Sequence, residues 1–300
     1  MQALVLALLL AAVLAFFLPA VQDRVRSALH ARPAAILAVP FLLMALFSGA
    51  AVLAGAFSFP LAVLVLGYTA APVVCAWAGP RGRPAGFIDR PGALDFAAIL
   101  LLWLPLEFAA GARLVPLPAR GFLHSVAYGI AILLGLVLFT GFRSFPAMKY
   151  NLPRRWSDFG LPVAAFAITA PVLMVVGIAI GFIPLPHWPA AAATGGRMAG
   201  ALGVILAGTA LPEEILFRSL IQNLIVLRFG ASWRTILGAS LIFGCAHLDN
   251  GPQPLPNWRY MILATIAGVA YGMVFQRAST VLSSAALHAM VDWTKHFFFY

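Results

Sequence analysis

Ionisable side chains stand inside an apolar stretch in the last third of the sequence. Glu213 and Glu214 are adjacent, and Arg218 follows the second glutamate by four residues. Charged groups are costly at membrane depth, so such a cluster predicts a functional site. Glu214 and Arg218, at i and i+4 with the acid first, are expected to pair on one helix face. Glu213 projects about 100° away and can therefore act on water.

Two further groups in apolar segments supply imidazoles. His247 is predicted to lie at the same depth as Glu213, because the two segments that carry them would form an antiparallel hairpin. Asp292 follows His288 by four residues, so it can orient that imidazole, hold its proton or join it as a metal ligand. In straight helices His288 would lie about 10 Å shallower than Glu213. A tilt, or a break in the helix of Glu213, is therefore required to bring them together.

The composition places these residues in a polytopic membrane protein. The 300 residues are 63% hydrophobic and 9% charged, whereas soluble domains carry about 25% charged residues. A membrane-spanning helix takes roughly 20 apolar residues, so we predict an all-α helical bundle with about eight to ten transmembrane helices. Strands are not expected, because the alternation of a membrane barrel is absent. The net charge of +10 comes from basic residues in short loops, as the positive-inside bias predicts, and nucleic-acid binding is not expected.

Apolar runs separated by Pro, Gly and Arg predict ten helices. Their approximate bounds are 2–20, 34–56, 60–77, 94–110, 121–142, 161–182, 198–227, 233–248, 259–276 and 279–298. The first run is interpreted as a transmembrane helix and not as a secretory signal, since it lacks a basic leading segment. The distribution of the arginines favours an external N-terminus.

A seam rich in proline and glycine at residues 183–197 divides the predicted helices into two groups. Residues 1–182 would form N-terminal transmembrane helices to which the sequence assigns no role. Residues 195–300 would form the catalytic helical core, because all the strong candidate site residues follow the seam. No internal repeat is visible.

Three motifs in this order on successive helices resemble the CPBP family. They are Glu213-Glu214-x-x-x-Arg218, Phe243-x-x-x-His247 and His288-x-x-x-Asp292. That family comprises the type II CAAX prenyl endopeptidases and the bacterial abortive-infection intramembrane proteases. The resemblance covers roughly residues 195–300.

The resemblance implies a catalytic site of six residues: Glu213, Glu214, Arg218, His247, His288 and Asp292. In it, Glu213 and His247 would activate the attacking water, and Glu214 with Arg218 would support the first glutamate. The second histidine and the aspartate would stabilise the oxyanion. The prenyl endopeptidases usually have Asn at the last position, and an ionised Asp292 cannot donate a hydrogen bond. We therefore expect Asp292 to orient its histidine or to bind a metal.

Two routes to the activated water stay open. Four of these groups could hold a divalent ion such as Zn²⁺ and lower the pKa of its bound water to about 7. The ligands would be Glu213, His247, His288 and Asp292. Alternatively, Glu213 would act as a general base without a metal cofactor.

The expected function is that of an intramembrane endopeptidase, a multi-pass protein of the bacterial cytoplasmic (inner) membrane. It would act on a membrane-anchored or lipidated peptide or protein substrate within the lipid bilayer. A transporter, or a proton or cation pathway, could use the same polar cluster, although such folds often show internal repeats. A non-catalytic immunity or scaffold protein of the same fold is the third alternative.

Overall fold

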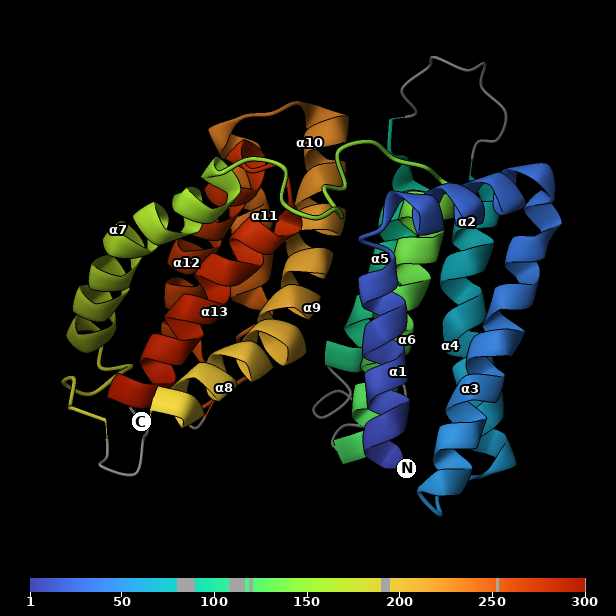
Figure 1. Ribbon diagram of the computed structural model, residues 1–300, viewed down its shortest axis with the longest axis horizontal. Helices are drawn as coiled ribbons and strands as arrows, with labels where there is room; N and C mark the ends of the chain where they lie inside the picture. The colour runs from blue at the N-terminus through green and yellow to red at the C-terminus, as the bar shows by residue number, and fades with distance from the viewer. Residues whose placement is uncertain (80–89, 108–116, 119–120, 190–194, 252–253, 300) are drawn as a thin grey trace. The chain divides into compact units, whose positions relative to one another are not determined.

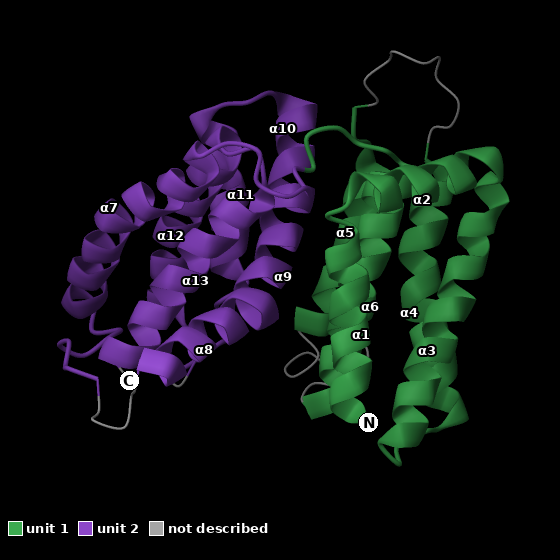
Figure 2. Cartoon of the chain, viewed as in Figure 1, with its two compact units in different colours: residues 1–148 green, residues 149–300 purple. Residues whose placement is uncertain are grey.

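The computed structural model describes residues 1–79, 90–107, 117–118, 121–189, 195–251 and 254–299 (Figure 1). The elements within these ranges are helices, and no strand occurs among the described residues. The predicted all-α membrane bundle is confirmed. The chain divides into two compact units, residues 1–148 and residues 149–300 (Figure 2).

Unit 1 contains the N-terminal helices. They are α1 (Gln2–Ala15), α2 (Pro19–Ala31), the 3-10 helix η1 (Pro33–Ala38), α3 (Val39–Leu53), α4 (Phe59–Ala78), α5 (Ala93–Glu107), α6 (Gly121–Leu136) and the π-helix η2 (Val137–Phe142). A buried ion pair joins Arg143 Nε to Asp95 Oδ1 at 2.8 Å and so ties the end of η2 to the start of α5. Many large apolar side chains remain exposed, as expected for a surface that faces lipid.

The first predicted helix, residues 2–20, is not one continuous element. Helix α1 ends at Ala15, and α2 begins at Pro19 and runs at 84° to α1. Proline has no backbone N–H and its ring clashes with the preceding turn, so Pro19 disfavours a straight continuation of α1 and suits the first turn of α2, where it lies. The charged residues that follow were assigned to a loop because they interrupt the apolar run. They lie in α2, a helix with one polar side.

Six described helices are long and apolar enough to cross a membrane, or seven if α1 and α2 form one broken span. They cover Pro33–Leu53, Phe59–Ala78, Gly121–Phe142, Ser157–Ala179, Gly195–Phe229 and Trp258–Arg277. The described part of α5 has 15 residues and α11 has 13, both short of the roughly 20 that a span requires. Residues 108–110 of the helix predicted at 94–110 lie outside the described residues. The sequence predicted more transmembrane helices than these seven, because it also counted α5, α11 and α13, the last of which carries polar residues.

Unit 2 contains α7 (Ser157–Ala179) and all the elements that follow. They are α8 (Gly195–Ile205), η3 (Leu206–Ala210), α9 (Leu211–Glu214), η4 (Ile215–Gln222), α10 (Asn223–Phe229), α11 (Trp233–Cys245), α12 (Trp258–Arg277) and α13 (Val281–Phe298). The boundary between the units therefore precedes α7, whereas the sequence had grouped residues 1–182 together. Helix α7 packs against α12 and α13.

The segment that leads into α7 fixes the turn between α12 and α13. Lys149 Nζ donates hydrogen bonds to three carbonyl oxygens at the end of α12 and just beyond it, at 2.6, 2.9 and 3.0 Å. Burial, and secondly the charge of Arg155, lowers the pKa of Lys149 from its ordinary value. Asp158 accepts hydrogen bonds from the backbone N–H and the hydroxyl of Ser279. These contacts define where α13 begins, and α13 carries His288 and Asp292.

Candidate active site

The helical stretch that carries the paired glutamates is irregular. Two π-helical segments, η3 and η4, flank the four-residue α9 that contains Glu213 and Glu214. Pro212 supplies no N–H to the regular helical hydrogen-bond pattern, and π-bulges are frequent at functional sites. The stretch changes direction between α8 and α9 (Figure 1). The helical stretch Gly195–Phe229 is bent here but not broken. Glu213 Oε2 lies 3.9 Å from His288 Nε2, so the two residues meet without the break that the sequence argument offered as one alternative.

A fully buried ion pair joins the second of the two glutamates to Arg218. Arg218 Nε lies 3.1 Å from Glu214 Oε2, and both side chains are 0% exposed. The same-face pair predicted from the i, i+4 spacing is confirmed. Arg218 Nη1 also donates to Gln222 Oε1 at 3.3 Å, and Gln222 Nε2 donates to the Gly272 carbonyl of α12 at 3.0 Å. The guanidinium lies 5.0 Å from the centre of the Phe243 ring, within cation–π range.

His288 is oriented by contacts with both ring nitrogens. Its Nδ1 lies 3.2 Å from Glu214 Oε1. A carboxylate that is paired with Arg218 only accepts hydrogen bonds, so Nδ1 is the donor. Its Nε2 lies 3.5 Å from Asp292 Oδ2, on the cavity side of the ring. The Tyr271 ring stacks on the imidazole with centroids 4.6 Å apart, so the plane of the histidine ring is also fixed.

His247 lies just after the end of α11, in the turn that follows Cys245. Its Nδ1 lies 2.8 Å from the Phe243 carbonyl oxygen. A carbonyl can only accept, so Nδ1 donates, and Nε2 of the neutral ring is left with a lone pair that can accept a proton. Phe243 separates the two histidines, because its ring packs edge-on against His247 at 4.7 Å and against His288 at 5.8 Å.

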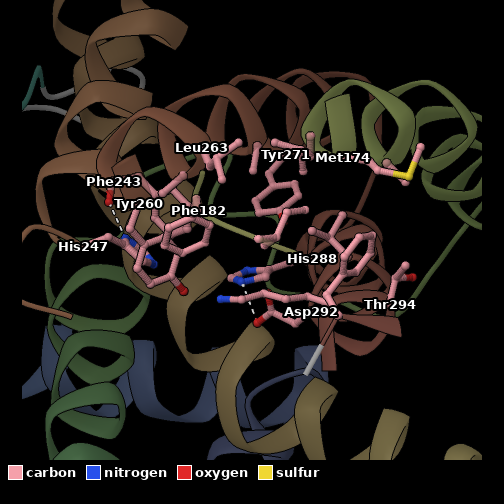
Figure 3. Close-up of a pocket in the computed structure, with 18 of the residues that line it drawn as sticks. Met174, Phe182, Phe243, His247, Tyr260, Leu263, Tyr271, His288, Asp292 and Thr294 are labelled. Atoms are coloured by element: carbon pink, nitrogen blue, oxygen red, sulfur yellow. Dashed lines mark hydrogen bonds and ion pairs between the residues drawn. The ribbon is translucent and has the colours of Figure 1, made fainter. Parts of the chain in front are cut away.

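Most of the candidate site residues line one cavity of about 130 Å³ in unit 2. Four of the six line it: Glu213, His247, His288 and Asp292. Figure 3 shows the histidines and Asp292 around this space, with Tyr260 and Tyr271 beside them. One ordered water takes about 10–15 Å³ of such volume, so water and part of a substrate can be held together. Glu214 and Arg218 lie outside the lining and act through their contacts.

The remaining walls of the cavity are largely apolar. Helix α7 contributes Ala170, Leu173 and Met174, and α12 contributes Leu263 and small residues. Elsewhere on α7, Val163, Ile168 and Val175 are exposed, as expected of a helix that faces lipid. The cavity therefore combines a few ionisable groups with walls that suit an apolar chain.

The lining residues that the sequence did not predict include two tyrosines and a lysine. Tyr260 and Tyr271 lie on α12, and neither stands at a motif spacing from another candidate residue, so no spacing signal marks them. Lys295 lies seven residues after His288, on the same helix face, and that spacing could have identified it.

No group of three or more His, Cys, Asp and Glu side chains that could hold a metal ion occurs in the parts of the chain that the structure describes. The four residues that the sequence analysis considered as possible metal ligands thus share a cavity but do not form such a group. We derive no step through a metal.

Comparison with known proteins finds a family match in the C-terminal third of the chain. Residues 195–294 match the family model described as type II CAAX prenyl endopeptidase Rce1-like. The match covers the three motifs and confirms the resemblance that they indicated. It supports a CAAX-type intramembrane protease at the level of the family. No curated protein and no solved structure matches the chain.

Proposed function

We propose that this chain, whose residues 195–294 match the Rce1-like type II CAAX prenyl endopeptidase family model, hydrolyses a peptide bond in a membrane-anchored or lipidated peptide or protein. One observation carries the proposal. Glu213 and His247 come from different helical segments and line the same cavity, which His288 also lines. The Ala- and Arg-rich composition supports a place in the bacterial cytoplasmic membrane.

In the proposed mechanism, Glu213 and His247 activate one water molecule. The Glu213 side chain is 24% exposed, so it is accessible from the cavity. Its carboxylate takes a proton from the water, while His247 Nε2 accepts a hydrogen bond from the same molecule. The water oxygen attacks the carbonyl carbon of the substrate and forms a tetrahedral oxyanion. As the C–N bond breaks, the proton held by Glu213 passes to the leaving nitrogen.

The other motif residues keep these groups in position. Glu214 holds His288 through Nδ1 and is itself held by Arg218, which reaches α12 through Gln222. His288 Nε2 faces the Asp292 and Glu213 carboxylates, so it orients both of them. Groups that are already fixed in place do not have to reorient during the reaction. This preorganisation is the main source of electrostatic catalysis.

The apolar walls support a substrate that reaches the site from the bilayer. A segment anchored in lipid could lay apolar side chains against the α7 residues that line the cavity while its scissile bond meets the acids and imidazoles. Exclusion of bulk water by such a segment would strengthen the electrostatic interactions at the polar end.

The proposal is tested by reconstituting the purified protein in liposomes with a library of membrane-anchored, internally quenched peptides. We expect Glu213→Gln and His247→Asn each to lower the cleavage rate by roughly 10²- to 10⁴-fold, the usual contribution of a general acid–base group. His296→Asn is a matched control, because His296 packs on Phe297 and does not line the cavity. Full activity in both site variants, at unchanged expression and thermal stability, would exclude this mechanism.

A further inference from the structure

Tyr271 brings a buried hydroxyl to the cavity from α12. Its side chain belongs to the lining, and the residue is only 1% exposed. Among the residues that the structure describes, none forms a hydrogen bond with this hydroxyl. A buried tyrosine O–H usually has a hydrogen-bond partner, because an unpaired buried polar group costs free energy. A molecule that enters the cavity can supply this partner.

The Tyr271 ring is held in one orientation by its neighbours. It stacks on the His288 imidazole with ring centroids 4.6 Å apart and an interplanar angle of 20° (Figure 3). The Phe243 ring packs edge-on against it at 6.1 Å, and the Arg218 guanidinium lies 5.9 Å from its centre. A tyrosine side chain has only two χ angles, so the contacts that fix the ring also fix the hydroxyl.

The backbone beside Tyr271 is tied to the helical stretch that follows the glutamates. Gln222 of η4 donates a hydrogen bond to the Gly272 carbonyl at 3.0 Å and accepts one from Arg218 at 3.3 Å. A Cβ at position 272 would lie 2.6 Å from Gln222 Oε1, so glycine allows this close approach. These contacts fix α12 against η4, and they thereby fix Tyr271 relative to the paired glutamates.

The neighbours of Tyr271 indicate what its hydroxyl can do. The imidazole on which the ring stacks faces the Glu213 and Asp292 carboxylates through Nε2, at 3.9 and 3.5 Å. When water attacks a peptide carbonyl beside these acids, negative charge develops on the carbonyl oxygen. Tyrosine is one of the side chains that stabilise such an oxygen by donating a hydrogen bond. A phenol ionises only in strongly alkaline solution, so the hydroxyl keeps its proton at neutral pH.

We infer that Tyr271 is a further catalytic residue, whose hydroxyl donates a hydrogen bond to the carbonyl oxygen of the scissile peptide bond. When the water oxygen bonds to the carbonyl carbon, the C=O π electrons move to the oxygen and this hydrogen bond strengthens. When the C–N bond breaks, the carbonyl reforms and the hydrogen bond weakens. Tyr271 keeps its proton throughout. This inference rests on the proposed peptidase function.

The replacement Tyr271→Phe removes one oxygen atom and keeps the ring that stacks on His288. On an anchored, internally quenched peptide that the wild type cleaves, we expect kcat to fall by roughly 10²- to 10³-fold with little change in KM, as for loss of one oxyanion donor. The midpoint of denaturant unfolding should stay at the wild-type value, because the hydroxyl loses no protein partner. An unchanged kcat, a raised KM alone, or a lowered midpoint would overturn the inference.

Tyr68→Phe is the matched control. The Tyr68 hydroxyl is buried in unit 1, where it donates a hydrogen bond to the Leu102 carbonyl at 2.6 Å, and Tyr68 does not line the cavity. Here the midpoint of unfolding should fall, because a buried hydrogen bond is lost, and kcat should stay at the wild-type value. An equal loss of kcat in the two variants would show that the effect of Tyr271→Phe does not arise in the cavity.

A second readout reports the oxyanion contact itself. A phosphonamidate analogue of the same peptide carries a negative tetrahedral centre, and transition-state analogues report transition-state contacts. Its inhibition constant should rise in Tyr271→Phe by about the factor by which kcat falls. An unchanged inhibition constant would overturn the assignment of Tyr271. Absence of any cleavage by the wild type would instead overturn the proposed function itself.

Discussion

Replacing Glu214 by leucine removes one partner of a fully buried ion pair. Both side chains are 0% exposed and 3.1 Å apart. Without Glu214, the Arg218 charge would keep Gln222 and the faces of two aromatic rings, those of Phe243 and Tyr271. Removing one partner of a buried pair costs about 3–5 kcal/mol, because the remaining charge is not solvated. At about 1.4 kcal/mol for each factor of ten, the ratio of folded to unfolded protein falls by roughly 150- to 5,000-fold.

The double variant Glu214→Leu with Arg218→Met separates stability from activity. Apolar replacement of a whole buried pair is often neutral or stabilising, so most of the lost free energy of unfolding should return. Cleavage should not return, because His288 Nδ1 no longer has its carboxylate acceptor. The free energy of unfolding is measured by denaturant titration of the purified protein in lipid, and the cleavage rate with the anchored peptide.

Two results would refute this reasoning. If Glu214→Leu unfolds at the same denaturant concentration as wild type, the buried ion pair does not contribute to the free energy of unfolding as its burial indicates. If the double variant cleaves at the wild-type rate, Glu214 does not orient His288.

Three further predictions concern the packing and chemistry of unit 2. Gly244→Ala should lower the free energy of unfolding by about 1–3 kcal/mol, because the new Cβ would lie 2.7 Å from the Met261 carbonyl oxygen. The control in the same denaturant titration is Gly238→Ala, because a Cβ at Gly238 would meet no atom within 4 Å. Lys149→Met should lower the melting temperature and slow cleavage in parallel, because three carbonyl oxygens lose their hydrogen-bond donor and the start of α13 is no longer fixed. A melting temperature equal to that of the wild type would contradict this prediction. Incubation with a strong metal chelator should leave kcat/KM unchanged, because the described residues form no metal-binding group, and loss of activity restored by added Zn²⁺ would show otherwise.

Local spacing predicted much of the site. The Glu214–Arg218 pair follows from the i, i+4 geometry of one helix, and the hairpin argument correctly anticipated that Glu213 and His247 reach a shared space. The catalytic roles of these residues stay predictions until they are tested by substitution.

Other features depend on interactions that a single sequence does not display. Helix α2 was missed because its charged residues interrupt the apolar pattern that marks a span. Helix α7 is apolar on all sides, so its sequence does not show that it packs with α12 and α13. The Lys149 and Asp158 contacts that tie it there join residues more than 120 positions apart. Lys295 was not predicted as a site residue, because the motif on that helix consists of an imidazole and an acid.

The central claim is that Glu213 and His247 act on the same water molecule, and a double-mutant cycle tests it most directly. The values of kcat/KM are measured for wild type, Glu213→Gln, His247→Asn and the variant with both changes, on one anchored peptide. Residues that act as a unit are strongly non-additive, so the double variant should be hardly slower than the slower single variant. If the two losses multiply, the glutamate and the histidine act independently and the account is wrong.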